Sequence, residues 1–417
     1  IQEILNNRRG MKLRSVDCLD IVNIIASVVV AGNVRRSAII ILGDPWDKEY
    51  LKAKRWDLGN VPTQRAMANF SVVVDDVDDL HPLFWKTYEE GEPFGIVNRT
   101  NMQKYGRMGE LKPDSAIGVY PCAEATLEDG EPCNLQEIAL PNLANEAEFI
   151  EAARLMHRWG KRVTMEKYHQ PKCDAVVKRN RRIGTGITGC LQSPLFNPQM
   201  LDRVYQAIQD ENKAYSAELG IPESIRTTVI KPSGTISKVF DCYEGVHPAY
   251  SRYIIQRVRF SANDPLLPLL KEAGHHMEPV VRFDGSFDHN TQVVDFYVAA
   301  PEDAPVADEG WTTWKQLDVV KMAQKHWADQ AVSVTVYYRK EELPQLKAWL
   351  ADNLKYLKTI SFLCHSEHGF KQAPKETITK EQYEKLSEKI KPINIDNTGD
   401  GLLESSLECE GGACPVK

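Results

Sequence analysis

The sequence predicts an α/β fold, because segments typical of strands alternate with segments typical of helices along almost the whole chain. Strand-like runs such as residues 38–42 and 331–338 are separated by helical patterns such as residues 145–165 and 198–219. The chain has 417 residues, 42% of them hydrophobic, which is enough to bury a large core. This alternation favours either a barrel or a doubly wound sheet.

The first third of the chain contains a predicted central helix and a basic loop. Residues 18–31 are apolar almost throughout, and Gly32 is a natural C-terminal stop for that helix. The loop that follows includes Asn33, Arg35 and Arg36. Its arginines suit a nucleotide or a phosphate, and a solvated loop explains them equally well. The next elements are strands predicted at 38–42 and 70–75 and helices predicted at 80–89 and 98–105.

Gly184, Gly186 and Gly189 match the G-x-G-x-x-G pattern of dinucleotide-binding loops. That pattern requires a hydrophobic strand directly before it, whereas the preceding residues 178–182 are Lys-Arg-Asn-Arg-Arg. We therefore interpret these glycines as positions where a helix packs closely against a sheet.

A hydroxyl-rich turn follows the strand predicted at 226–230. Ser233, Thr235 and Ser237 surround Gly234, and the turn also offers backbone N–H groups. Such a turn suits phosphate oxygens. The G-x-x-x-x-G-K-[ST] spacing of a Walker A loop is absent, and a plain β-turn is the alternative interpretation.

The second half of the chain continues the same alternation. Strands are predicted at 252–260, 291–299, 331–338 and 359–364, and helices at 265–274, 312–328, 342–357 and 379–390. After about residue 394 the composition becomes polar and rich in Gly, Glu and Ser, which predicts a flexible tail. The predicted domains are therefore residues 1–393 and a tail, residues 394–417.

Composition and charge exclude several classes of protein. A net charge of −7 argues against a surface that binds nucleic acid, and we find no signal peptide and no apolar run of about 18 residues that could span a membrane. Nine cysteines, most of them isolated, indicate a reducing, cytoplasmic setting rather than a secreted disulfide framework. Because the chain opens at Ile1 without Met, we expect a fragment, a processed product or one half of a split protein.

Two cysteines and a carboxylate mark the candidate active site. Cys122 and Glu124 are two residues apart, so in an extended segment their side chains would point the same way. This would place a thiol beside a potential general base. Cys133 follows soon enough in the chain to return to the same pocket. The stretch therefore predicts a thiol-based site, and we assign no metal ligands to the chain.

A second pair of cysteines, Cys409 and Cys414, lies in the predicted tail, where a Gly-Gly pair gives the backbone freedom to close a small disulfide ring. A tethered dithiol at high effective concentration is a good reductant for a disulfide elsewhere. The alternative is half of a zinc site, but the tail lacks the further Cys or His that four ligands require.

Together these motifs resemble class II ribonucleotide reductases, in particular the adenosylcobalamin-dependent ribonucleoside-triphosphate reductase type. The similar stretches extend over essentially the whole chain and are Gly32–Ser37, Cys122–Glu124, Gly130–Leu135, Pro232–Ser237, Gly245–Arg252, His368–Pro374 and the Cys409/Cys414 pair. The resemblance implies that the chain forms the C-terminal portion of a ten-stranded α/β barrel, with the radical cysteine on a central finger loop.

The resemblance also implies a role for each residue of the site. Cys122 would become a thiyl radical, generated with adenosylcobalamin, and would take the 3′-hydrogen of the ribose. Glu124 would act as general base on the 3′-hydroxyl. Cys133 would be one of two thiols that reduce the substrate and end as a disulfide. Cys409 and Cys414 would reduce that disulfide again and would then be reduced by a thioredoxin-like partner.

Nucleotide binding follows from the same resemblance. The residues expected to hold the substrate phosphate are Ser233, Gly234, Thr235 and Ser237, and those expected to link a deoxynucleotide effector to the substrate base are Asn33, Arg35 and Arg36. One position departs from the family, which has asparagine where this chain has Tyr120. Tyrosine is larger, although its hydroxyl can still donate and accept hydrogen bonds.

The implied function is the reduction of ribonucleoside triphosphates to 2′-deoxyribonucleotides, once a partner supplies the N-terminal part of the barrel. The alternative is a catalytically inactive or regulatory nucleotide-binding half of a split reductase, which Tyr120 and the missing N-terminal part favour. A general dithiol oxidoreductase would need a C-x-x-C motif, which is absent. The oxygen-dependent class of reductases passes its radical through a Tyr-Tyr pair, and we interpret Tyr337 and Tyr338 as a structural pair at the end of a strand.

Overall fold

The structure is a computed structural model, and it describes residues 1–28, 30–31, 35–36, 38–59, 61–62, 64–65, 68–281, 285–302, 304–307, 309–365 and 372–393; for 30–31 and 35–36 it describes the backbone only. The chain divides into two compact units. Unit 1 comprises residues 1–29, 36–249 and 302–368, and unit 2 comprises residues 30–35, 250–301 and 369–417. The chain combines helices and strands, so the predicted α/β fold class is confirmed.

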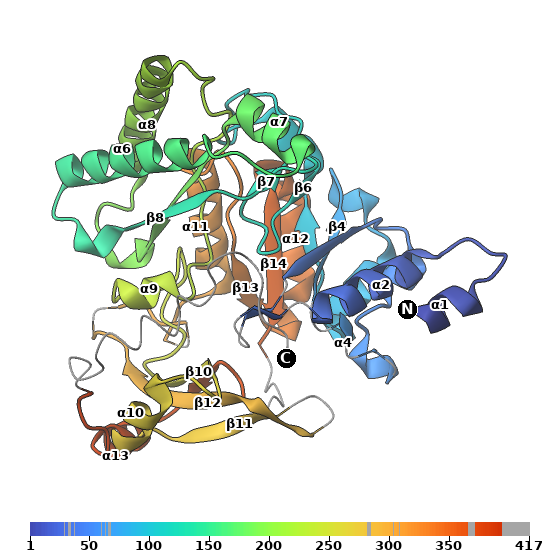
Figure 1. The fold of residues 1–417 in the computed structure, drawn as a ribbon, viewed down its shortest axis with the longest axis vertical. Helices are drawn as coiled ribbons and strands as arrows, with labels where there is room; N and C mark the ends of the chain where they lie inside the picture. Colours follow the sequence, from blue (N-terminus) through green and yellow to red (C-terminus); the bar gives the residue numbers. More distant parts are fainter. Residues whose placement is uncertain are drawn as a thin grey trace. The chain divides into compact units, whose positions relative to one another are not determined.

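Unit 1 is built around a five-stranded sheet with the strand order β13-β14-β5-β4-β3 (Figure 1). The strands are β3 (Ile39–Gly43), β4 (Ala68–Val73), β5 (Gly95–Val97), β13 (Thr335–Tyr338) and β14 (Thr359–Cys364). Strands β3, β4 and β5 run parallel, as do β13 and β14, and the two blocks meet where β14 pairs antiparallel with β5. These strands are apolar over most of their length, as expected when both faces of a sheet are covered.

Helices and aromatic side chains cover this sheet. The helices that precede or follow its strands in the sequence are α2 (Ser15–Val28), α3 (Lys48–Leu51), α4 (Pro82–Glu90), α5 (Arg99–Lys104), α11 (Thr313–His326) and α12 (Leu343–Asn353). The buried ring of Tyr50 stacks on Phe70, and its hydroxyl lies 2.8 Å from the carbonyl oxygens of both Ile41 and Ser71, either of which can accept its hydrogen bond. The hydroxyl of Tyr338 donates to the carbonyl of Tyr88 at 2.7 Å, so this tyrosine has a structural contact in the core.

A second strand pair in unit 1 packs against helix α6 (Glu146–Val163), and α6 packs against α8 (Pro198–Leu219); α7 (Pro171–Asn180) lies between these two helices in the chain. The pair consists of β8 (Leu135–Ala139) and β9 (Gly184–Thr188), which run parallel. Single parallel bridges from Thr185 to Thr228 and from Ile230 to Val332 continue from β9 toward the segment before β13. The strand predicted at 226–230 is thus reduced to isolated bridges.

The glycines of the G-x-G-x-x-G pattern lie in and after a strand, so the prediction that they seat a helix against a sheet is wrong. A Cβ on Gly184 would lie 2.4 Å from the side chain of Leu135 on the neighbouring strand. A Cβ on Gly186 would lie 2.9 Å from both Glu137 and Lys231. The glycines of β9 therefore make room for side chains of adjacent segments of the sheet.

Unit 2 is an antiparallel sheet with the order β11-β12-β10-β15. Its strands are β10 (Tyr253–Ser261), β11 (Met277–Val281), β12 (Phe287–Ala299) and β15 (Lys375–Thr377), and its helices are α10 (Leu266–Glu272) and α13 (Lys380–Ser387). Leu267, Leu270 and Val294 form its small core. Arg257 pairs with Asp295 of β12 and with Glu376 of β15, which joins three strands through one side chain.

The remaining elements are short and are α1 (Gln2–Asn7), β1 (Val30–Ala31), β2 (Arg35–Arg36), β6 (Gly118–Val119), β7 (Thr126–Leu127) and α9 (Ile236–Val239). Within the described ranges, no helix combines the length and the apolarity needed to cross a bilayer. The long predicted helices at 145–165 and 198–219 are confirmed as α6 and α8, and the predicted strand at 359–364 as β14.

Candidate active site

The candidate thiol lies in the tight loop between β6 and β7, which pair antiparallel. The N–H of Tyr120 donates to the carbonyl of Ala125 at 2.8 Å, and the N–H of Ala123 donates back to the carbonyl of Tyr120 at 2.7 Å. Ala123 has φ +63°, in the left-handed region. The segment is therefore a turn, and the expectation of an extended segment with Cys122 and Glu124 on one face is wrong. Cys122 reaches the surface, whereas Glu124 is buried.

The backbone of this turn is held from the other side of the site. Residues of the segment before β13 and of the start of β14 donate one hydrogen bond to each of three successive carbonyls of the turn. A side chain of the same segment accepts one hydrogen bond from a backbone N–H that follows the turn. Cys122 O accepts from Ser333 Oγ (2.6 Å), Ala123 O from Thr359 Oγ1 (3.0 Å) and Glu124 O from the N–H of Ala331 (2.9 Å), while the N–H of Thr126 donates to Gln330 Oε1 (3.1 Å). The position of the thiol therefore depends on residues some 200 positions away in the chain.

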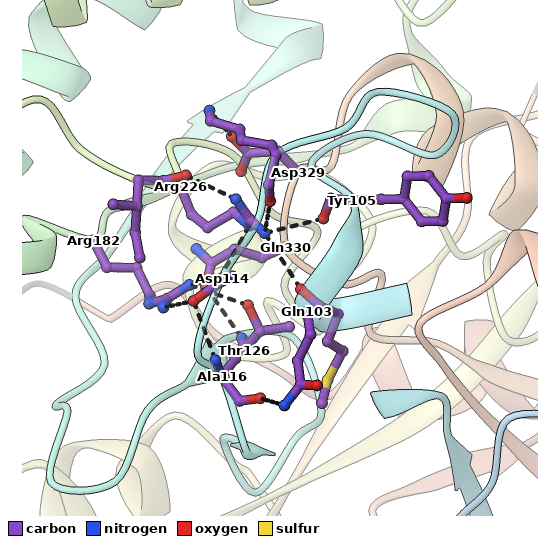
Figure 2. Close-up of polar contacts among 12 residues, drawn as sticks. Gln103, Tyr105, Asp114, Ala116, Thr126, Arg182, Arg226, Asp329 and Gln330 are labelled. Atoms are coloured by element: carbon purple, nitrogen blue, oxygen red, sulfur yellow. Dashed lines mark hydrogen bonds and ion pairs between the residues drawn. The ribbon is translucent and has the colours of Figure 1, made fainter. Parts of the chain in front are cut away.

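Behind the turn lies a buried cluster of charges. Figure 2 shows the side chains of Arg182 and Arg226 converging on Asp114. Arg182 donates to both carboxylate oxygens at 2.8 Å and also lies 2.9 Å from Glu131. Burial raises the pKa of Asp114, but the bonds and charge of Arg182 and the charge of Arg226 outweigh burial, so that its pKa lies below the ordinary value.

The same cluster continues to the segment that holds the turn. Asp329 is completely buried and accepts from the backbone N–H groups of Thr227 and Thr228 at 2.9–3.0 Å. Lys358 Nζ donates to the carbonyls of Asp329 (2.7 Å) and Tyr105 (2.8 Å). These contacts order residues 329–333 and the start of β14, the two segments that hold the turn. Sequence reasoning missed the whole cluster, because its members are isolated charges with no motif.

Glu124 has the environment of a general acid or base. Burial raises the pKa of its carboxyl to about 7, against an opposing effect of the Lys231 charge. Its Oε2 atom is buried and has no hydrogen-bond partner among the described residues. A carboxyl with a pKa near neutrality can both take up and release a proton at physiological pH.

The two thiols are held in their protonated form. Although part of Cys122 reaches solvent, burial of its thiol and the nearby charge of Glu124 raise its pKa to about 11. Burial and the same carboxylate raise the pKa of Cys133 to about 12. Nucleophilic catalysis by cysteine requires a lowered pKa, so this environment does not favour a thiolate nucleophile. It suits reactions in which the S–H group gives or receives a hydrogen atom.

The predicted residues Tyr120, Cys122, Glu124 and Cys133 share one site. Burial raises the pKa of the Tyr120 phenol, and the groups that add to this effect are Cys133, Glu124 and Cys122. A cavity of about 340 Å³ opens beside Cys122. It is lined by apolar side chains, including Ile40 and Phe362, and by polar ones such as Asn69, Ser71 and Ser333. Its volume lies in the range of small-molecule sites, about 300–1,000 Å³.

The hydroxyl-rich turn is also next to this site, since Pro232 lines the cavity. Ser233 and Ser237 are buried, whereas Gly234 and Thr235 are exposed. The hydroxyl of Ser233 donates to Glu137 at 2.7 Å, and Glu137 was not predicted as a site residue. Its only signal in the sequence is its position four residues after Cys133.

The structure does not describe the side chains of several predicted site residues. Asn33, Cys409 and Cys414 lie outside the described residues, and for Arg35 and Arg36 only the backbone of β2 is described. Their roles stay predictions.

Comparison with known proteins agrees with these observations. No family model matches the chain. It is 34% identical, over an alignment 464 positions long, to the adenosylcobalamin-dependent ribonucleoside-triphosphate reductase of Lactobacillus acidophilus and 36% identical, over 467 positions, to that of Levilactobacillus brevis. Both alignments cover 100% of this chain and 61% of the relative, so the chain spans about three-fifths of the length of these curated relatives.

Solved structures show the same relationship. The crystal structure of a B12-dependent (class II) ribonucleotide reductase matches with a TM-score of 0.77 and 32% identity, over 100% of this chain and 60% of that one. The alpha subunit of the Actinobacillus ureae class Id ribonucleotide reductase matches with a TM-score of 0.54 and 14% identity, over 85% of this chain and 76% of that one, a likeness of fold alone. The fold is thus similar to that of part of a class II ribonucleotide reductase. At over 30% identity along its whole length, the chain is similar to about three-fifths of the length of the adenosylcobalamin-dependent ribonucleoside-triphosphate reductases.

Proposed function

We propose that this chain is the C-terminal catalytic portion of a class II ribonucleotide reductase, which reduces ribonucleoside triphosphates to 2′-deoxyribonucleotides. The observation that carries the proposal is the site itself, where the charge of a buried carboxyl, whose Oε2 atom has no hydrogen-bond partner among the described residues, acts on two protonated thiols. The two thiols and the carboxyl, Cys122, Cys133 and Glu124, are three of the groups that radical reduction of a ribose needs.

The residues at the cavity fit the adenosyl group of the cofactor that the relatives' name specifies. The cavity beside Cys122 is large enough for a nucleoside and offers both apolar and hydrogen-bonding walls. The corrin ring of the cofactor is larger than this cavity, and we propose no residues that contact it. Adenosylcobalamin, when bound, supplies the radical that oxidises the Cys122 thiol. Two side chains keep the cysteine loop at the cavity wall. The amide of Asn69 donates to the carbonyl of Pro121 at 2.8 Å, and the hydroxyl of Ser333 donates to the carbonyl of Cys122.

In the proposed reaction, the sulfur radical of Cys122 takes the 3′-hydrogen of the ribose, so that an S–H bond forms as the C–H bond breaks. Glu124 accepts the proton of the 3′-hydroxyl, and the 2′-hydroxyl leaves as water with a proton from one of the two reducing thiols. Cys133 and a thiol from the N-terminal part of the enzyme become a disulfide and supply two electrons and the hydrogen that replaces the hydroxyl at C2′. Glu124 then returns its proton to the 3′-oxygen, and Cys122 returns the hydrogen atom to C3′ and becomes a radical again. Cys409 and Cys414 reduce that disulfide by exchange and pass the oxidation to a thioredoxin-like protein.

The remaining predicted roles belong to the same proposal. The strands of unit 1 form part of a ten-stranded barrel that the N-terminal portion completes, with the turn around Cys122 as its finger loop. Residues 1–393 are the reductase domain, and residues 394–417 are the redox-active tail. The exposed backbone of Gly234 and Thr235 binds substrate phosphate, and the loop with Asn33, Arg35 and Arg36 responds to a deoxynucleotide effector.

The test is turnover in the presence of the N-terminal portion, adenosylcobalamin and a thioredoxin system, with deoxynucleotide measured by chromatography. Cys122→Ser should abolish product, because a hydroxyl does not form the radical. Cys173→Ser, at a half-buried cysteine on α7, is the matched control and should retain activity. Product formation by Cys122→Ser would overturn the proposal.

One observation favours a second candidate, a nucleotide-binding half without turnover. Tyr120 is partly buried at the site, where a phenol occupies more space than the asparagine expected from the family. In that case nucleotide would bind without reaction, and Tyr120→Asn would restore or increase turnover.

A further inference from the structure

Glu137, Lys231 and Ser233 form a compact polar cluster between β8 and the hydroxyl-rich turn. Lys231 Nζ lies 2.7 Å from Glu137 Oε2, and Ser233 Oγ donates to Glu137 Oε1 at 2.7 Å. The side chain of Glu137 is 4% exposed and that of Lys231 is 18% exposed. One carboxylate therefore holds both a cation and the first hydroxyl of the turn.

The neighbouring strand leaves space for this cluster. A Cβ on Gly186 of β9 would lie 2.9 Å from Glu137 Oε2 and 2.9 Å from Lys231 Cδ, and contacts below 3.0 Å force a shift. The glycine that sequence analysis could not connect to a function is thus the residue that allows the ion pair to form.

Glu137 also holds an uncommon backbone conformation at Ser233. Ser233 has φ +55°, which a residue with a side chain seldom adopts. Such a conformation persists only where surrounding contacts specify it, and the bond from its hydroxyl to Glu137 is such a contact. Because this hydroxyl is already engaged beside a carboxylate, contact with substrate phosphate falls to Gly234 and Thr235, which are exposed.

Lys231 directly precedes Pro232, which lines the same cavity as Cys122, and its charge acts on the reactive groups. Its charge lowers the pKa of Glu124 and of Cys133, in opposition to burial, which is the largest effect on both. The other groups that act on Glu124 are its own backbone and Glu137, and those that act on Cys133 are Glu124 and Cys122. Among the described residues, Lys231 is thus the cation that acts on both groups.

We propose that Lys231, held by Glu137, is a positioning residue that couples the phosphate-binding turn to the base Glu124 and the reducing thiol Cys133. Its ammonium limits how far burial suppresses ionisation of these groups, and Glu137 keeps both the ammonium and Ser233 in place. The consequence for catalysis rests on the proposed function, whereas the effect on the reactivity of Cys133 does not.

The direct test is alkylation of each cysteine by iodoacetamide, followed by peptide mass spectrometry on the full chain without cofactor. At about pH 9, where Glu124 is ionised, Lys231→Met should slow alkylation of Cys133 relative to Cys122 by about threefold to tenfold, because loss of the ammonium raises the pKa of Cys133. Glu137→Gln should accelerate it, because the ammonium loses its counter-charge.

The opposite signs separate this mechanism from structural damage. Loosening of the site would expose Cys133 and accelerate alkylation in both variants. Lys238→Met is the matched control, since Lys238 pairs with Glu244 at 3.0 Å a few residues further along the same segment, and its rate ratio should equal that of the wild type. If Lys231→Met left the alkylation rate of Cys133 relative to that of Cys122 unchanged, or increased it, the inference would be overturned.

Turnover distinguishes this inference from the function on which it partly rests. With the N-terminal portion and cofactor present, Lys231→Met should move the acidic limb of the pH–rate profile to higher pH, because the pKa of Glu124 rises. If the variants showed the expected changes in alkylation but the wild-type chain showed no turnover, the proposed function would be refuted and the electrostatic role of Lys231 would stand. Turnover with an unshifted profile in Lys231→Met would refute the role of Lys231 alone.

Discussion

Replacing Asp114 by asparagine is expected to destabilise unit 1 strongly. The Asp114 side chain is 0% exposed and that of Arg182 is 4% exposed, and two hydrogen bonds of 2.8 Å join them. Arg226 Nε lies 3.3 Å from the same carboxylate. Asparagine keeps the shape but leaves two buried guanidinium groups without this counter-charge. Loss of one partner from a buried pair costs about 3–5 kcal/mol, and because Glu131 still contacts Arg182 we expect about 3 kcal/mol.

The assay is equilibrium unfolding in urea, followed by tryptophan fluorescence and circular dichroism. Asp129→Asn is the matched control, because Asp129 pairs with Lys172 at the surface, where both side chains are more than half exposed, and should change the free energy of unfolding little. If Asp114→Asn altered the free energy of unfolding no more than this control, the proposed structural role of the cluster would be refuted.

The pH dependence gives an independent measurement of the same interaction. The pKa of Asp114 lies below its ordinary value of 3.8 in the folded chain, so the unfolded chain binds the proton more readily. The contribution of Asp114 to stability is therefore complete above about pH 4 and is lost as the pH falls through the lowered folded value. Asp114→Asn should lack this part of the acid dependence of unfolding.

Three further outcomes are expected. Ser333→Ala removes the 2.6 Å bond to the carbonyl of Cys122; stability should fall by about 1 kcal/mol and kcat should fall more than KM changes, as steady-state kinetics would show. Glu124→Gln should lower kcat by about 10²- to 10⁴-fold and remove the pH–rate limb near pH 7, and a retained limb would assign it to another group. Burial lowers the pKa of His157 to about 4, so the wild type should lose stability from about pH 6.5 down to about pH 4, whereas His157→Leu should not show this loss in unfolding experiments at several pH values.

The order and type of the elements could be predicted from sequence because hydrophobic periodicity is a local property. The helices at α6 and α8 and the strands at β3 and β14 were all expected from apolar spacing alone. The strand predicted at 226–230 failed because its backbone groups pair with more distant segments by single bridges, which local sequence does not encode.

The motif around Cys122 was also recognisable from sequence, but its geometry was not. Alternation along a strand would have placed Cys122 and Glu124 side by side, whereas the left-handed residue Ala123 turns the chain between them. That conformation is maintained by donors from Ser333 and Thr359, more than 200 residues away. No local pattern contains this information.

The chemical character of the site depends on folding for the same reason. The residue types of the site, two cysteines and a carboxylate, are written in the sequence and are sufficient to indicate thiol chemistry. Their protonation states are not, because the raised pKa values of Glu124, Cys122 and Cys133 arise from burial and from charges that other segments bring near. Lys231 illustrates the difference, since its effect on Glu124 exists only after β8 and the hydroxyl-rich turn have come together in unit 1.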